Sequence, residues 1–196
     1  MKKERPLVEA LLNFVKDDPV SLHVPGHKNG LVSNLPASLK AALKFDVTEI
    51  TGLDDFHHPE ESIAEAQQLL SEAYNTEHSY FLVNGSTVGN LAMIYAVCNY
   101  GDTIIVQRNA HKSIFHAIEL VGAKPVFVSP EWDEHTMTAG AVATSTLREA
   151  LLLYPEAKAV VFTYPTYYGV VSDELAEQIE LCHAVKILKS FLATVP

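Results

Sequence analysis

Four polar motifs in this sequence hold residue types that could bind a ligand or do chemistry. The sharpest reads Val83-Asn84-Gly85-Ser86-Thr87-Val88-Gly89. A glycine lets a ligand approach the backbone, two hydroxyl side chains can donate hydrogen bonds, and a helix beginning here would offer unpaired N–H groups to a phosphate. A plain helix cap by Ser86 or Thr87 explains the same residues, so both interpretations stay open. The motif matches neither a P-loop nor the Gly-x-Gly-x-x-Gly fingerprint.

A histidine and a group of tyrosines mark the next two motifs. The segment Arg108–Ser113 contains His111, which could stack on a planar heterocycle or transfer a proton. A solvated histidine–lysine pair at a helix start explains that segment equally well. The segment Thr163–Gly169 holds three tyrosines and Thr166 between a proline and a glycine. It could line a pocket, or it could be a rigid turn with aromatic packing.

The fourth motif lies nearer the N-terminus, in His23–Gly30 and Thr51–Pro59. The adjacent pair His57 and His58 raises the hypothesis of a metal site. We reject it, because no other histidine or cysteine stands at ligand spacing and adjacent side chains in extended chain point opposite ways. The pair Asp54-Asp55 could receive a substrate ammonium group, with a solvated turn or a helix cap as the alternative.

Apolar periodicity predicts the elements that must position these motifs. Pro6–Lys16 favours a first helix, and residues 19–59 form an arm rich in Pro, Gly, His and Asp with a short amphipathic piece at 35–43. From residue 60 helices and strands alternate. Helices are predicted over 63–73, 87–100, 113–121, 145–154 and from Asp173, as the N-cap, through His183, and strands over 79–83, 103–107, 125–128 and 158–163.

The strands are short and wholly apolar, which is typical of a parallel sheet with helices on both faces. The fold class is therefore α/β. We predict a helix and arm over 1–59, a partial α/β domain over 60–184 and an aberrant or truncated tail over 185–196. Three of the four motifs follow predicted strands, so they should share one edge of the sheet, where α/β folds bind ligands.

Composition narrows the class of partner. The 196 residues carry 24 acidic and 14 basic side chains, a net charge of −10, which argues against a nucleic-acid binder. No apolar run approaches the ~20 residues that cross a bilayer, and no signal peptide is visible. The two cysteines, Cys98 and Cys182, lie in apolar contexts and are expected to be free thiols in a reducing compartment. A cytoplasmic protein is expected.

Five motifs occurring together and in order are typical of one family. They are His23–Gly30, Thr51–Asp55, Phe81–Thr87, Arg108–Ser113 and Pro165–Gly169. This set resembles the Orn/Lys/Arg decarboxylases, fold-type I pyridoxal-phosphate enzymes that decarboxylate basic amino acids. It looks most like their compact Gram-positive type, and the resemblance runs from about residue 5 to residue 184.

The resemblance implies the N-terminal part of such an enzyme's major domain, with pyridoxal 5'-phosphate as cofactor. Gly85, Ser86 and Thr87 would hold the cofactor phosphate. His111 would stack on the pyridine ring as the one catalytic residue present, and Thr166 would lie near the ring hydroxyl or the phosphate. The substrate would be arginine, lysine or ornithine, the product a diamine or polyamine, and the assembly a homodimer or larger homo-oligomer with the arm near the active-site entrance.

Residues 185–196 depart from the family's pattern. The family continues with Asp-Glu-Ala-His-Gly, whose aspartate pairs with the ring nitrogen, and later with Ser-x-His-Lys, whose lysine holds the cofactor as a Schiff base. Neither motif occurs here. We therefore expect a frameshift or truncation, and no decarboxylase activity from this chain alone. Two alternatives stay open: a non-catalytic remnant that binds a phosphate-bearing ligand or a partner, and another fold-type I enzyme such as an aminotransferase.

Overall fold

The computed structural model describes residues 5–185. The chain divides between Phe81 and Leu82 into two compact units, which we describe separately.

The first unit is helical with long irregular connections. Its elements are α1 (Pro6–Asp17), α2 (Ala37–Lys40), the 3-10 helix η1 (Ala41–Lys44) and α3 (Ser62–Tyr74). Helix α1 begins with a proline at its first position, as predicted, and ends at Asp18 in the left-handed conformation. It packs against α3. The predicted helices of this region are confirmed to within a residue or two.

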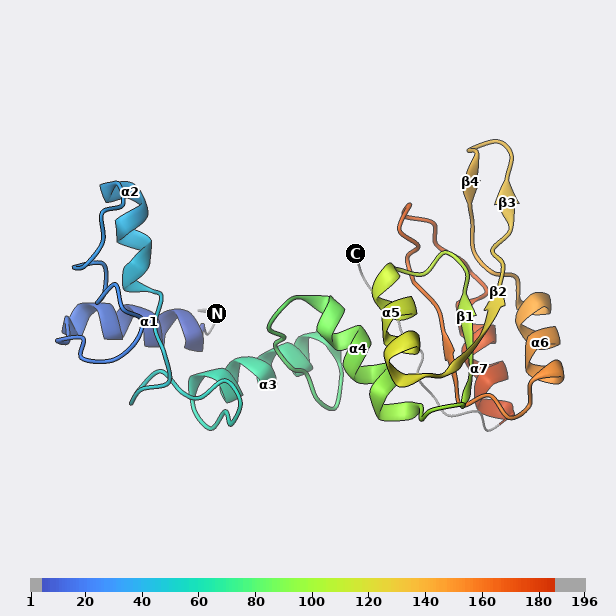
Figure 1. The fold of residues 1–196 in the computed structure, drawn as a ribbon, viewed down its shortest axis with the longest axis horizontal. Coiled ribbons are helices and arrows are strands. Elements are labelled where there is room, and N and C mark those ends of the chain that lie inside the picture. The colour runs from blue at the N-terminus through green and yellow to red at the C-terminus, as the bar shows by residue number, and fades with distance from the viewer. Residues whose placement is uncertain (1–4, 186–196) are drawn as a thin grey trace. The chain divides into compact units, whose positions relative to one another are not determined.

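The second unit alternates helices and strands. Its elements are α4 (Ser86–Val97), β1 (Thr103–Gln107), α5 (Lys112–Val121), β2 (Lys124–Val128), β3 (Trp132–Asp133), β4 (Thr138–Ala139), α6 (Thr144–Leu153), β5 (Ala159–Val161) and α7 (Leu175–Ala184). The strand order is β2-β1-β5, and both pairings are parallel. Figure 1 shows α4 and α5 on one side of this sheet and α6 and α7 on the other. The predicted fold class is confirmed.

Alternate residues of the central strand serve two separate cores. Ile104 and Val106 join a cluster with α4 and α5, whereas Ile105 joins a cluster with α6 and α7. Each cluster also buries one free cysteine, Cys98 in the first and Cys182 in the second. Burial raises the pKa of both thiols. They are packing residues of the two cores, as their apolar contexts predicted.

The predicted strand at 79–83 is wrong, because these residues adopt no regular structure. Tyr80, Leu82 and Val83 are 70%, 49% and 54% exposed. An apolar run becomes a strand only where a neighbouring backbone pairs with it, and the described residues offer this run none. The loop predicted around Trp132 contains the hairpin β3–β4 instead.

The predicted start of the last helix needs correction. Helix α7 begins at Leu175 after Glu174, so Asp173 is not its N-cap. Strand β2 lies at one edge of the sheet, where Phe127 is 43% exposed. On the opposite edge, β5 pairs only with β1 among the described residues. The expected aberrant tail lies, beyond Val185, outside the described residues.

Within residues 5–185, no helix combines the length and the apolar character needed to traverse a lipid bilayer.

Candidate functional site

The start of α4 lies at an exposed turn. Asn84 and Gly85 have φ values of +67° and +72°, and the turn they form delivers the chain into the helix. A Cβ on Gly85 would meet nothing within 4 Å, so the glycine serves its backbone conformation. Ser86 and Thr87 are exposed, and neither hydroxyl makes a hydrogen bond within the described residues. The alternative that these hydroxyls merely cap the helix is therefore not realised. The N–H of Val88 donates to the Gly85 carbonyl at 3.2 Å, whereas those of Ser86 and Thr87 have no acceptor among the described residues.

His111 lies at the start of α5 and is its N-cap residue. Its Nδ1 accepts a hydrogen bond from the backbone N–H of Ser113 at 3.2 Å and lies 2.8 Å from the Ser113 Oγ. The residue itself is exposed. One edge of the imidazole is thus fixed to the protein, while the ring remains accessible to a ligand.

Helices α4 and α5 are joined by a buried polar contact. The amide of Asn90, in the second turn of α4, donates to the Ser113 Oγ at 2.7 Å. Asn90 and Ser113 are 4% and 1% exposed. Because Asn90 lies one turn beyond Ser86 and Ser113 lies two residues beyond His111, this contact holds the beginnings of the two helices together.

A second buried polar residue links the ends of neighbouring strands. Gln107 is the last residue of β1, and its Oε1 accepts the backbone N–H of Thr163 at 3.2 Å while its Nε2 donates to Asn109 at 2.6 Å. The loop after β5 is closed by Thr166, whose hydroxyl accepts the N–H of Val170 at 3.1 Å. Gln107 therefore ties the loop that leads to His111 to the loop that contains Thr166.

The structure places the predicted site residues at one edge of the second unit. In Figure 1, α4 and α5 begin at the end of the unit where β1 ends. Gly85, Ser86 and Thr87 lie at the start of α4 and His111 at the start of α5, joined through the buried contact. Thr166 is 2% exposed, and its hydroxyl is engaged within its own loop. The motif Val83–Gly89 lies at this edge, but no strand precedes it, contrary to the predicted strand at 79–83.

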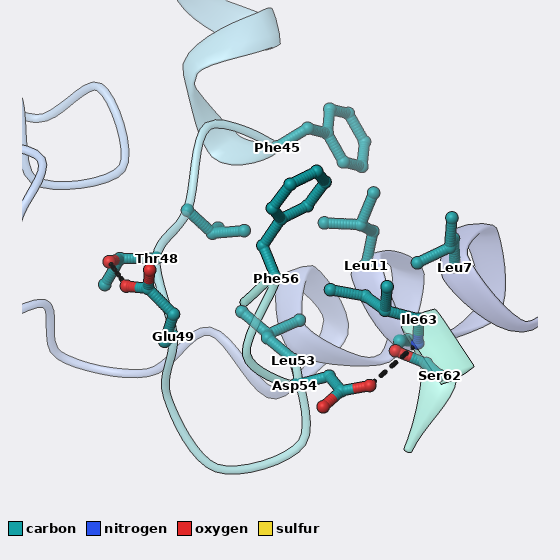
Figure 2. Close-up of a pocket in the computed structure, with 12 residues that line it drawn as sticks. Leu7, Leu11, Phe45, Thr48, Glu49, Leu53, Asp54, Phe56, Ser62 and Ile63 are labelled. Atoms are coloured by element: carbon teal, nitrogen blue, oxygen red, sulfur yellow. Dashed lines mark hydrogen bonds between the residues drawn. The ribbon is translucent and has the colours of Figure 1, made fainter. Parts of the chain in front are cut away.

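The first unit holds an apolar cavity of about 300 Å³. Figure 2 shows Leu11, Phe45 and Phe56 directed into it, with Asp54 at its rim. These side chains come from α1, η1's C-terminal end and the arm, so the cavity is the loosely filled core of this unit. Its polar lining is limited to a few groups at the rim, including Asp54, whose carboxylate is occupied by backbone donors.

Asp54 caps α3 from eight residues upstream. Its carboxylate accepts the N–H groups of Glu60, Glu61 and Ile63 at 3.0, 2.9 and 2.9 Å, and also that of its neighbour Asp55. Desolvation raises the pKa of this carboxyl, but the backbone donors outweigh it and hold the pKa well below its ordinary value. Of the two alternatives for the Asp54-Asp55 pair, the structure shows the helix cap for Asp54.

Across residues 5–185, no three His, Cys, Asp or Glu side chains come together as metal ligands. His57 and His58 follow the turn that Asp54 and Asp55 organise, and the exposed His58 Nε2 lies 3.4 Å from Glu60 Oε1.

Asn90, Ser113 and Gln107 are positioning residues that the sequence did not single out for this role. A faint signal existed for two of them, because Asn90 interrupts an apolar helix and Gln107 ends an apolar strand. Their partners lie 23 and 56 residues away. Only the folded structure reveals those contacts.

A parallel sheet flanked by helices, with an exposed helix start and an exposed imidazole at one edge, is an α/β unit in which ligands generally bind at that edge. The profile described as "Orn/Lys/Arg decarboxylase, major domain" matches residues 5–189. The chain belongs to this family.

Curated relatives agree with the family assignment. An uncharacterized Bacillus subtilis protein, YaaO, is 50% identical over 180 residues, which are 91% of this chain and 37% of YaaO. An arginine decarboxylase from Halalkalibacterium halodurans is 37% identical over 93% of this chain and 38% of its own length. The lysine decarboxylase LdcA of Pseudomonas aeruginosa is 26% identical over 91% of this chain and 27% of its own. The chain thus spans less than two fifths of these relatives.

Solved structures share the fold. The Francisella novicida lysine decarboxylase LdcF superposes with a TM-score of 0.75 at 22% identity, over 85% of this chain and 26% of that one. The constitutive lysine decarboxylase of Escherichia coli gives 0.73 at 23% identity, over 84% and 25%. A serine palmitoyltransferase from Sphingomonas wittichii gives 0.51 at 24% identity, over 63% and 28%. These likenesses establish the fold alone.

Proposed function

We propose that this chain supplies the phosphate-binding and ring-stacking part of a pyridoxal-phosphate site in a decarboxylase of arginine, lysine or ornithine, whose product is a diamine or polyamine. The observation that carries the proposal is the contact between Asn90 and Ser113, which holds the open start of α4 beside His111. Family membership supports both the cofactor and the class of substrate.

The residues of this chain fit the cofactor's chemistry. The free N–H groups at the start of α4, together with Ser86 and Thr87, would bind the phosphate, because a helix start offers donors and a positive dipole end. His111 would lie against the pyridine ring, with its inner edge held by Ser113. Thr166 would help to shape the wall beside the cofactor, since its hydroxyl already accepts a bond from its own loop.

When bound, pyridoxal phosphate supplies an electron sink that stabilises the carbanion left by loss of carbon dioxide. This chain's residues contribute orientation to that chemistry. The start of α4 would fix the phosphate end, and His111 would fix the plane of the ring, so that the scissile bond of a bound amino acid can be aligned with the ring's π system.

We further propose that the 196 residues do not catalyse decarboxylation by themselves. They contain neither the Asp-Glu-Ala-His-Gly nor the Ser-x-His-Lys motif that the family uses to hold the ring nitrogen and to bond the cofactor. Release of carbon dioxide from arginine, lysine or ornithine by the purified chain, above that of a mock preparation, would contradict this. Borohydride reduction followed by peptide mapping should likewise find no lysine specifically bonded to the cofactor.

Cofactor binding can be tested on the chain as it exists. Equilibrium dialysis with pyridoxal phosphate should show saturable binding that inorganic phosphate displaces. The variant Ser86→Asp should weaken binding at least about tenfold, because a carboxylate at the helix start repels the phosphate. Ser145→Asp makes the same change in the first turn of α6 and should leave affinity within about twofold. Equal losses in both variants would refute the proposed cradle.

The partners and compartment follow the same proposal. The arm exposes several large apolar side chains, including Val20, Leu22 and Leu31, which favours a homodimer or larger homo-oligomer. The free cysteines and the small charged substrate fit a cytoplasmic enzyme. The acidic net charge argues against nucleic acid as a partner.

A further inference from the structure

We infer that Asn90 and Ser113 form a hydrogen-bonded chain that holds the imidazole of His111 in its Nε2–H tautomer, so that its inner nitrogen is an acceptor and its outer edge and face meet a planar cofactor. The tautomer follows from this chain's own contacts. Its use against a pyridine ring rests on the proposed function.

The direction of each bond is fixed by chemistry. A backbone N–H can only donate, so the Ser113 N–H at 3.2 Å makes His111 Nδ1 an acceptor that carries no proton. The Ser113 Oγ receives one bond from the Asn90 amide at 2.7 Å and has a single proton of its own. That proton is left for His111 Nδ1, 2.8 Å away. Nδ1 therefore receives two donors, and the ring proton resides on Nε2.

The burial of Asn90 and Ser113 favours the Nε2–H tautomer of His111 over the Nδ1–H tautomer. Asn90 and Ser113 are 4% and 1% exposed, so water cannot readily replace either partner. Exchanging the ring proton to Nδ1 would leave the backbone N–H of Ser113 without its acceptor, and the Ser113 hydroxyl would have to turn its own proton away from the ring. His111 itself is exposed, which leaves Nε2–H and the ring faces available. A neutral imidazole can also lie against a protonated pyridine ring without repulsion between like charges.

The first test reads the tautomer directly. A long-range 1H–15N correlation spectrum of the uniformly 15N-labelled chain, with His111 assigned by the peaks lost in His111→Asn, reports which ring nitrogen is protonated. We expect a pyrrole-type signal for Nε2 and a pyridine-type signal for Nδ1. A protonated Nδ1, or an average of both tautomers, would overturn the inference without any variant.

Variants then test the residues that hold the ring. Ser113→Ala and Asn90→Leu should each lower the ratio of Nε2–H to Nδ1–H tautomer about fivefold, the effect expected from losing roughly one hydrogen bond. Ser113→Thr retains the hydroxyl and should keep the tautomer ratio of the unsubstituted chain. Ser145→Ala is the matched control, since Ser145 occupies the same second position in α6 and is exposed. The backbone amide spectrum confirms folding of each variant.

Failure of this inference is distinguishable from failure of the proposed function. An unchanged tautomer ratio in folded Ser113→Ala overturns the inference, even where pyridoxal phosphate still binds the chain. Conversely, an Nε2–H tautomer that responds to Ser113→Ala supports the hydrogen-bonded chain, even where dialysis shows no cofactor binding and the proposed function is refuted.

Discussion

Gln107 is a single buried side chain that connects the two loops of the candidate site. It is 2% exposed at the end of β1 and uses both ends of its amide, one toward Thr163 and one toward Asn109. Because the side chain is buried, water cannot readily replace the Thr163 contact, so Gln107 should stabilise the fold more than an exposed glutamine does.

We predict that Gln107→Leu lowers the free energy of unfolding of the second unit by about 1–3 kcal/mol, because the buried Thr163 N–H loses its acceptor. Urea unfolding followed by circular dichroism measures this. Gln68→Leu is the control, since Gln68 donates only to exposed Glu72, and it should change stability by less than about 0.5 kcal/mol. Equal effects of the two substitutions on the free energy of unfolding would show that the contact between Gln107 and Thr163 does not stabilise the fold.

Asp54 acts at the scale of an element, because it organises the start of α3. Its pKa lies well below the ordinary 3.8. Burial raises this pKa, but the backbone N–H groups of Glu60, Asp55, Glu61 and Ile63 together lower it by more. The carboxylate is more acidic in the folded chain than in the unfolded one. Its stabilisation is therefore present above about pH 4 and is lost as the pH falls through the lowered pKa.

Asp54→Asn should cost the first unit roughly 1–2 kcal/mol at pH 7, because the amide keeps one acceptor oxygen but loses the second oxygen and the charge that accept these backbone N–H groups. The difference from the unsubstituted chain should shrink as the pH falls below about 4, and thermal unfolding at a series of pH values would reveal this. Asp55→Asn is the matched control, because Asp55 accepts only the local N–H of His57 and is exposed. A difference for Asp54→Asn that persists undiminished in acid would contradict the role of its charge.

Comparison of the predicted and observed helices and strands shows which of them the sequence pattern determines. Apolar periodicity predicted all the longer helices and the strands β1, β2 and β5, because burial of one face repeats within a single element. It failed at residues 79–83, where an equally apolar run lacks a neighbouring strand among the described residues. The motifs placed Gly85, Ser86 and His111 at helix starts correctly, whereas the residues that join those starts depend on tertiary contacts.

The whole molecule presents two surfaces through which copies could associate. The arm exposes Val20, Leu22 and Leu31 at 84%, 89% and 80% of their areas, and the outer side of β5 has no pairing partner among the described residues. Exposed apolar side chains of this size favour burial against another surface, while an unpaired strand edge favours added strands. The two surfaces lie in different units, so substitutions can separate them.

We predict that association proceeds through the arm, because its apolar side chains are more exposed and more numerous than the three residues of β5. The double variant Leu22→Glu with Leu31→Glu should raise the dissociation constant at least about tenfold, equivalent to ~1.4 kcal/mol. Sedimentation velocity over a concentration series measures it. Leu152→Glu, which changes a leucine 76% exposed on α6, should leave association unchanged. If the double variant associates like the unsubstituted chain, the arm is not the interface, and the edge of β5 becomes the surface to block.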